Sequence, residues 1–289
     1  MRLLPDKRIL DALRCPLCQG KMTLESSMDG KSASLYCVGG PKRHCYDMAS
    51  SGYVNLMRPG HGDGGDSKEA VKARKDFLSL GYYAPAADAL CNLVGRYAKN
   101  KEGLLIDAGC GEGYYTSRLA GAGFSVVGVD LSRPAVDSAA KRLSAEQIKN
   151  GLFGVASVYE LPVLDGSAEA VVNVFAPCAE EEFMRALRPG GILAVMYAGP
   201  EHLMGLKRAI YENIYENDGR ADLPRQMRLL DEERVRFEIS VEGNAAVQNL
   251  FAMTPYYWKT SRRDGEKLKT LDSLTTTVDM VIGIYQKEE

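Results

Sequence analysis

The stretch LLIDAGCGEGYYT, residues 104–116, joins a short apolar run to a glycine-rich turn and then to a segment with helical character. Its glycines stand at 109, 111 and 113, whereas the fingerprint of dinucleotide-binding proteins is G-x-G-x-x-G. The carboxylate of Asp107, beside this turn, would repel a pyrophosphate and attract an amino group. The turn therefore favours a phosphate-free cofactor with a methionyl tail over a dinucleotide.

Two further segments follow the turn at strand-length spacing. FSVVGVD, residues 124–130, ends in Asp130, and an acid at the tip of a second strand can accept both hydroxyls of a ribose. ASVYELP, residues 156–162, places Ser157 near the tip of a third strand, within reach of an adenine ring. In this order the segments resemble the motif series of class I methyltransferases. S-adenosylmethionine is the predicted cofactor, with contacts at Asp107, Gly109, Gly111, Gly113, Asp130 and Ser157.

The rest of the chain supports an α/β fold. From residue 103 onward, short apolar runs alternate with amphipathic segments, a pattern typical of a parallel sheet covered by helices on both faces. The runs cover residues 103–109, 124–130, 152–157, 168–175 and 191–197. We expect late strands near 246–253 and 276–285 to complete the edge, and earlier helices from residue 68 to a stop at Gly81 and over 85–98.

Four of the seven cysteines lie close together near the N-terminus. Cys15 and Cys18 form a C-x-x-C knuckle, and Cys37 with His44 or Cys45 can supply the other two ligands of a tetrahedral zinc ion. Adjacent side chains rarely converge on one ion, so either His44 or Cys45 should be a bystander. Four protein ligands leave no position for water, which indicates one structural zinc ion in a small β module.

Bulk composition describes an ordinary globular protein. The chain has 289 residues, 45% of them hydrophobic and 26% charged, with a net charge of −2. No run approaches the roughly 18 apolar residues that cross a bilayer, and no secretory signal is evident, so we expect a cytoplasmic protein. The glycine-rich segment 58–67 indicates a linker. We therefore expect a zinc-ribbon module over 1–57, a linker and connecting helix over 58–84, and a methyltransferase domain over 85–289.

Several stretches together resemble one family, the bacterial 23S ribosomal RNA guanine-N1 methyltransferases with an N-terminal zinc ribbon. The stretches are CPLC at 15–18, RHCYDMASSGYVNL at 43–56, GDSKEAVKARKDFLSLGYYAP at 65–85, DAGCGEGYYT at 107–116, FAPC at 175–178, LRPGG at 187–191 and GPEHLMGLK at 199–207. The resemblance implies that the zinc ligands are Cys15, Cys18, Cys37 and His44. It also implies cofactor contacts at Tyr83, Gly111, Glu112 and His202.

The resemblance implies transfer of a methyl group to N1 of a guanine in a hairpin loop of 23S ribosomal RNA. Loss of the N1 proton requires a base, for which Glu112 and Asp66 are conceivable, and the catalytic residue stays unassigned. An RNA partner would be gripped by the basic side chains Lys42, Arg43, Arg58, Arg74 and Lys75.

Two other functions fit the same residues. One is a small-molecule methyltransferase whose zinc module mediates dimerisation, and the other is a non-catalytic, zinc-dependent RNA-binding factor. For partners we expect 23S ribosomal RNA and no membrane, with a homodimer left open.

Overall fold

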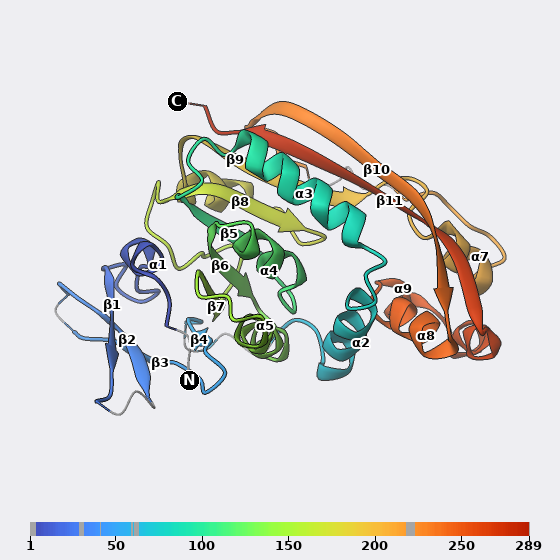
Figure 1. Ribbon diagram of the computed structural model, residues 1–289, viewed down its shortest axis with the longest axis horizontal. Helices are drawn as coiled ribbons and strands as arrows, with labels where there is room; N and C mark the ends of the chain where they lie inside the picture. The colour runs from blue at the N-terminus through green and yellow to red at the C-terminus, as the bar shows by residue number, and fades with distance from the viewer. Residues whose placement is uncertain are drawn as a thin grey trace.

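The large sheet is the centre of the computed structural model, which describes residues 4–28, 32–40, 42–58, 60, 64–217 and 223–288 (Figure 1). Within these residues eight strands pair in the order β10-β11-β9-β8-β5-β6-β7-β4. Their bounds are β4 Val54–Asn55, β5 Leu104–Ala108, β6 Ser125–Asp130, β7 Gly151–Val155, β8 Ala168–Val174, β9 Leu187–Ala198, β10 Arg228–Glu242 and β11 Ser273–Gln286.

The strands from β4 to β9 are parallel, and β5 lies between β6 and β8. Chain order therefore reverses direction at β5, and the carboxyl ends of strands around such a point form the usual ligand crevice of an α/β sheet. The predicted α/β class and all five early strands are confirmed. The sheet is mixed rather than wholly parallel, because β11 runs antiparallel to both β9 and β10.

The strand predicted over 246–253 is wrong, because these residues lie in helix α8, Asn244–Ala252. Its buried residues Ala246, Val247, Leu250 and Phe251 recur at helical spacing. The missing edge strand is β10, which precedes α8 and pairs with β11 along its length. Most of β10 is charged and partly or wholly exposed, as an edge strand should be, so it lacks a continuous apolar run. The prediction over 276–285 is confirmed within β11.

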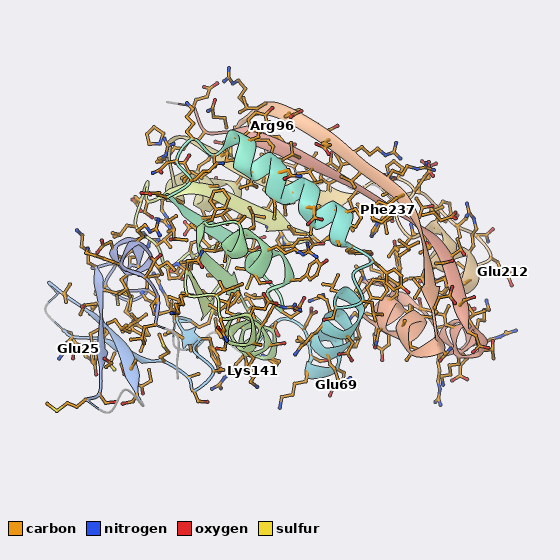
Figure 2. All side chains as sticks on the ribbon, in the orientation of Figure 1. Glu25, Glu69, Arg96, Lys141, Glu212 and Phe237 are labelled. Atoms are coloured by element: carbon orange, nitrogen blue, oxygen red, sulfur yellow. The ribbon has the colours of Figure 1, made fainter. Side chains whose placement is uncertain are left out.

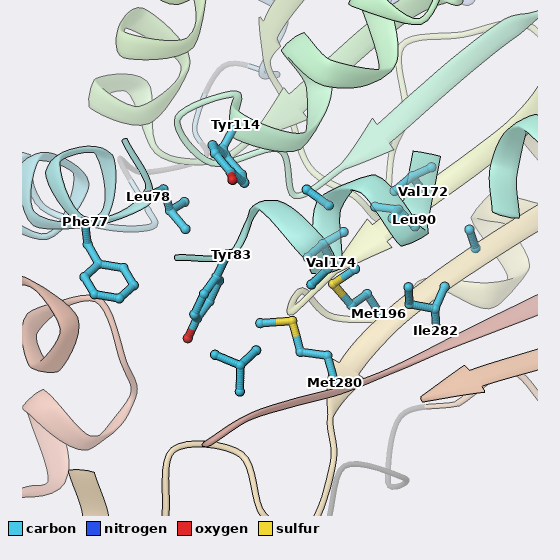
Figure 3. Packing of buried hydrophobic residues seen from close by; sticks show 14 of the residues in the cluster. Phe77, Leu78, Tyr83, Leu90, Tyr114, Val172, Val174, Met196, Met280 and Ile282 are labelled. Atoms are coloured by element: carbon cyan, nitrogen blue, oxygen red, sulfur yellow. The ribbon is translucent and has the colours of Figure 1, made fainter. Parts of the chain in front are cut away.

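Helices cover both faces of the sheet. Leu105 of β5 packs with helices on one face, while Leu104 and Ile106 pack on the other, because side chains alternate along a strand. Figure 3 shows part of the first cluster, with Leu90 near Val172. The first face carries α2 Lys68–Leu78, α3 Ala84–Tyr97, α4 Tyr114–Gly121, α7 Met204–Ile210 and α8, and the second carries α1 Lys7–Ala12 and α6 Glu180–Ala186.

The two predicted early helices are present. Helix α2 begins after Ser67, whose side chain accepts a hydrogen bond from Ala70 N, and ends before Gly81, which has φ +84°. Helix α3 matches the prediction over 85–98 to within its end residues. The remaining helices are α5 Arg133–Glu146, α9 Tyr256–Lys259, α10 Arg262–Glu266 and the 3₁₀ turn η1 Lys267–Thr270. Charged side chains such as Glu69 and Lys141 point outward from α2 and α5 (Figure 2).

The N-terminal module is a three-stranded antiparallel sheet of β1 Met22–Ser26, β2 Ala33–Cys37 and β3 Cys45–Asp47. It contacts the large sheet, because Ser125 Oγ donates to Asp6 Oδ2 at 2.7 Å and Leu13 bridges Val163. Strand β4, although N-terminal to residue 57, pairs with β7. The division at residue 57 stays a prediction, and parts of the predicted linker (59 and 61–63) lie outside the described residues.

Among the helices in the described ranges, none is long and apolar enough to cross a membrane.

Candidate active site and metal centre

The predicted metal ligands converge at one point of the N-terminal module. The ligand atoms of Cys15, Cys18, Cys37 and His44 all lie within 4.8 Å of one another. His44 Nδ1 is 3.5 Å from Cys15 Sγ and 3.4 Å from Cys37 Sγ. Cys15 and Cys18 occupy one tight turn, in which Gln19 N donates to Cys15 O at 2.8 Å. Cys37 ends β2, and His44 immediately precedes β3.

This donor set fits zinc. Zinc bonds of about 2.3 Å to sulfur and 2.0 Å to nitrogen place tetrahedral donors roughly 3.5 to 4 Å apart, and the two distances from His44 Nδ1 to sulfur agree with this spacing. Cys45 is exposed, and its Sγ faces Asp47 Oδ1 at 3.7 Å. The structure thus brings His44 into the cluster and leaves Cys45 outside it. Because the four donors would fill a tetrahedron, the site is suited to a structural role.

Hydrogen bonds support the sulfur atoms of this cluster. Tyr46 Oη lies 3.2 Å from Cys15 Sγ, and His44 N donates to Cys37 Sγ at 3.0 Å. Burial by itself would raise the pKa of Cys15, but the bonds from Tyr46 and from the backbone of Cys18 and Leu17 lower it below the usual value. The surroundings thus favour the thiolate form, which is the form that binds metal.

The glycine turn lies between β5 and α4, at the carboxyl end of β5. Gly109 has φ +86°, and a Cβ on it would lie 2.4 Å from the Cβ of Ala176, in the turn that follows β8. Gly113 has φ +83° and caps α4. These positions exclude larger residues because the backbone is left-handed and the neighbouring turn is in contact. The turn after β8 is therefore part of the same site.

Asp130, at the end of β6, is linked directly to the glycine turn. Its Oδ2 accepts from Gly111 N at 3.0 Å and its Oδ1 from Ser132 N at 2.8 Å. Burial raises the pKa of Asp130, and these two N–H groups oppose the rise. A carboxylate has about four lone-pair sites, so two remain for the hydroxyls of a ribose. The residues present thus fit the nucleoside part of S-adenosylmethionine.

Asp107 is 1% exposed and accepts a hydrogen bond of 2.5 Å from Thr116 Oγ1. Burial raises its pKa to about 7, with Thr116 lowering it and the charges of Asp130 and Glu112 raising it further. A positive group at this turn would relieve that penalty. The environment of Asp107 therefore fits a cationic cofactor.

Glu112 is 1% exposed and engaged elsewhere, since Arg142 of α5 donates to its Oε2 from Nη2 at 2.5 Å and from Nε at 3.2 Å. Asp66 is paired with Arg74 at 2.5 Å. Both carboxylates considered as the base are therefore already paired with arginine. The spacing of residues gave no sign of these partners, and the general base stays unassigned.

Tyr83 and His202 meet inside the protein, although they are far apart in sequence. Tyr83 Oη lies 3.4 Å from His202 Nε2, and Asp279 N donates to His202 Nδ1 at 3.2 Å. Burial lowers the pKa of His202 to about 4, so the ring is neutral at pH 7. Because Nδ1 accepts, Nε2 carries the proton and donates to Tyr83. The hydroxyl proton of Tyr83 can then be donated to a bound ligand.

Sequence reasoning did not single out Phe175, in the turn after β8. Its ring stacks on His202 with a centroid separation of 5.7 Å and an interplanar angle of 26°. Asn173 steadies this turn by donating to Ala108 O at 3.0 Å and to Pro177 O at 3.2 Å. An aromatic residue directly after an apolar strand was the available signal.

Ser157 lines a cavity of about 350 Å³ between the N-terminal module and the large sheet. Arg14 and Arg58 contribute from the module, and Arg58 forms an ion pair with Glu160. Tyr159, another lining residue, is 64% exposed. The cavity thus joins the predicted adenine-binding loop to the predicted RNA-binding module.

Most of the basic residues predicted to contact RNA have acidic partners. Arg43 pairs with Glu25, and Arg58 and Arg74 are paired as described above. Lys42 and Lys75 are exposed. Phosphate binding by these arginines would require exchange of an existing ion pair.

Comparisons with known proteins agree with this geometry. Residues 13–61 match the family model described as "RlmA, N-terminal", a zinc ribbon, and residues 105–191 match "Methyltransferase domain". A Streptomyces fradiae relative named "23S rRNA (guanine(748)-N(1))-methyltransferase" is 32% identical over 87% of this chain and 88% of its own.

Two further proteins illustrate the range of similarity. A Bacillus subtilis relative named "Putative 23S rRNA (guanine-N(1)-)-methyltransferase YxjB" is 29% identical over 97% of this chain and 100% of its own. A solved phosphoethanolamine N-methyltransferase of Haemonchus contortus, with S-adenosyl-L-methionine, has a TM-score of 0.47 at 16% identity, covering 77% of this chain and 58% of that one.

The two relatives named for 23S rRNA do not favour the small-molecule alternative. The chain has an S-adenosylmethionine-dependent methyltransferase fold, and a zinc ribbon precedes it. It therefore belongs to the 23S rRNA (guanine-N1-)-methyltransferase family with an RlmA-type N-terminal zinc ribbon.

Proposed function

We propose that this protein transfers a methyl group from S-adenosylmethionine to N1 of one guanine in a hairpin loop of 23S ribosomal RNA. The observation that carries the proposal is the joining of two sites in one chain. A Cys/His cluster suited to structural zinc packs against a methyltransferase sheet, and a relative that aligns with 87% of this chain is named for this reaction.

The donor-binding residues are those at the carboxyl ends of β5 and β6. The glycines at 109, 111 and 113 let the backbone approach the cofactor closely, and Asp130 accepts the ribose hydroxyls. Asp107 provides negative charge near the cationic tail, and Ser157 lies on the adenine side. Bound S-adenosylmethionine supplies an electrophilic methyl group on a sulfonium. The protein's task is then to position the acceptor atom and to remove its proton.

Tyr83 and His202 would contact the cofactor, as the family resemblance implies. The neutral ring of His202 donates from Nε2 to Tyr83 Oη, which would leave the hydroxyl proton of Tyr83 for the cofactor. Glu112 contributes through its ion pair with Arg142, which ties the glycine turn to α5. Its contact with the cofactor would be made by the backbone.

One zinc ion, held by Cys15, Cys18, Cys37 and His44, would fix the shape of the N-terminal module. The exposed side chain of Lys42 lies beside the cluster in sequence and would contact phosphate, as would Lys75 on α2. Guanine N1 is hidden in a paired helix, so the target must be unpaired or extruded. The module would hold the RNA hairpin while the base enters the methyltransferase site.

The test uses a 23S rRNA fragment that contains the guanine for which the Streptomyces fradiae relative is named. The purified protein is incubated with this RNA and labelled S-adenosylmethionine, and the RNA is then copied by primer extension. Methylation at N1 blocks pairing, so label incorporation and a stop at that guanine are expected. The matched control is the same RNA with adenine at that position. Label without a stop would reject N1 as the acceptor, and absence of label would reject the RNA substrate.

A further inference from the structure

Phe175 occupies an unusual backbone conformation at the mouth of the site. It follows β8 directly and has φ +51°. For a bulky residue this left-handed conformation is a genuine outlier. Such strain persists only where the surrounding structure imposes it, and it concentrates at functional sites. The conformation is therefore a reason to ask what the side chain does.

The ring of Phe175 is supported yet open. It stacks on His202, which is itself 7% exposed and held by hydrogen bonds from Asp279 N and to Tyr83 Oη. Despite this contact, Phe175 remains 49% exposed, in contrast to the buried phenylalanines of the core. A flat aromatic surface is thus held in a fixed orientation and presented to solvent.

The exposed ring of Phe175 belongs to the turn that packs against the glycine turn of the donor site. The next residue, Ala176, lies very close to Gly109, because a Cβ added to Gly109 would be only 2.4 Å from the Cβ of Ala176. Strand β8 neighbours β5 at the point where the strand order reverses. Phe175 is therefore adjacent in sequence to a residue that contacts the glycine turn, on the edge of the sheet where ligands of this fold bind.

We propose that Phe175 is the surface on which the target guanine stacks, with His202 supporting the ring from behind. This assignment rests on the proposed function, since it names the acceptor-binding residue of that reaction. Aromatic side chains bind unpaired bases by stacking, and a neutral imidazole behind the ring keeps it from turning away. The turn after β8 thereby brings the base to the donor.

The test compares three variants with the parent protein. Phe175→Tyr keeps a planar ring, Phe175→Leu keeps apolar bulk without one, and Phe175→Asn removes the ring while tolerating positive φ. For each, kcat/KM on the 23S rRNA fragment, S-adenosylmethionine affinity by calorimetry and Tm are measured. Phe237→Leu, on the outer strand β10, is the matched control (Figure 2).

Stacking predicts that Phe175→Leu and Phe175→Asn lower kcat/KM by about 10- to 100-fold without weakening the affinity for S-adenosylmethionine. Phe175→Tyr and Phe237→Leu should stay near the parent. Full activity of Phe175→Leu, or equal damage by Phe175→Tyr, would overturn the assignment while leaving the proposed function intact. An inactive parent protein would overturn the proposed function and the guanine as occupant together.

Discussion

Replacing Asp107 by asparagine removes a carboxylate whose charged form is destabilised by burial in the folded protein. Asparagine has the same shape and still accepts the hydrogen bond from Thr116, so the change isolates the ionisation of one carboxyl. The pKa of Asp107 rises from 3.8 in the unfolded chain to about 7 in the folded protein. Between these values the folded state binds a proton that the unfolded state has lost, so stability falls as pH rises.

The size of the stability loss follows from the difference between the pKa values of Asp107 in the unfolded and folded states. Each pH unit between these values costs about 1.4 kcal/mol, so the penalty reaches about 4 kcal/mol above pH 7 and is absent near pH 4. Without cofactor, Asp107→Asn should therefore be more stable than the parent at pH 8 by up to about that amount. The two proteins should converge as the pH is lowered toward 4.

Bound cofactor should remove the stability advantage of Asp107→Asn over the parent. A cationic donor favours the charged form of Asp107, so its binding to the parent at pH 7 should release protons. Asp107→Asn should bind S-adenosylmethionine more weakly, with no such release.

Urea unfolding from pH 5 to 8.5 measures the stability difference, and calorimetry in buffers of different ionisation enthalpy measures the protons released. Asp272→Asn, at an exposed position, controls for the change of side chain. A stability difference that is the same at pH 5 and pH 8 would refute the raised pKa of Asp107. Unchanged cofactor affinity would refute its role in binding.

Three further predictions concern the glycine turn, the ribose acid and the metal. Gly109→Ala adds a Cβ at φ +86° against the turn after β8 and should abolish methyl transfer. The control Gly123→Ala, at φ +102° with nothing within 4 Å of the new Cβ, should retain it. Measurement of kcat/KM for both variants tests this, and equal activity would contradict it. Asp130→Asn should weaken S-adenosylmethionine binding about 10-fold or more through loss of charge-assisted hydrogen bonds, and calorimetry showing parental affinity would contradict this. Cys37→Ser should lower the zinc content found by elemental analysis and abolish RNA methylation, while Cys45→Ser should keep both; equal zinc loss in the two variants would contradict the ligand assignment.

The parts of the site that could be predicted depend on local sequence. The strand, turn and helix around Gly109 lie within one short segment of sequence, and Cys15 and Cys18 of the knuckle are only three residues apart. The choice between His44 and Cys45 needed the third strand, because β3 begins at Cys45 and turns its side chain away from the cluster. Spacing alone does not reveal which neighbour points inward.

The parts that could not be predicted depend on contacts between distant residues. Arg142 lies on α5, and its pairing with Glu112 follows from how α5 packs beside the turn. The edge strand β10 carries charges because no strand among the described residues pairs with its outer side, although the alternation of Val235, Phe237, Ile239 and Val241 was a usable signal. The backbone of Phe175 is set by its surroundings and leaves no mark in the sequence.

The proposed reaction moves a methyl group from S-adenosylmethionine to N1 of a guanine in 23S rRNA. The most direct measurement is mass spectrometry of the nucleosides released from the RNA after reaction with deuterium-labelled methyl donor. Labelled 1-methylguanosine, formed only when the target guanine is present, is the expected product. A labelled 2-methylguanosine, 7-methylguanosine or methyladenosine in its place, or no labelled nucleoside at all, would contradict it.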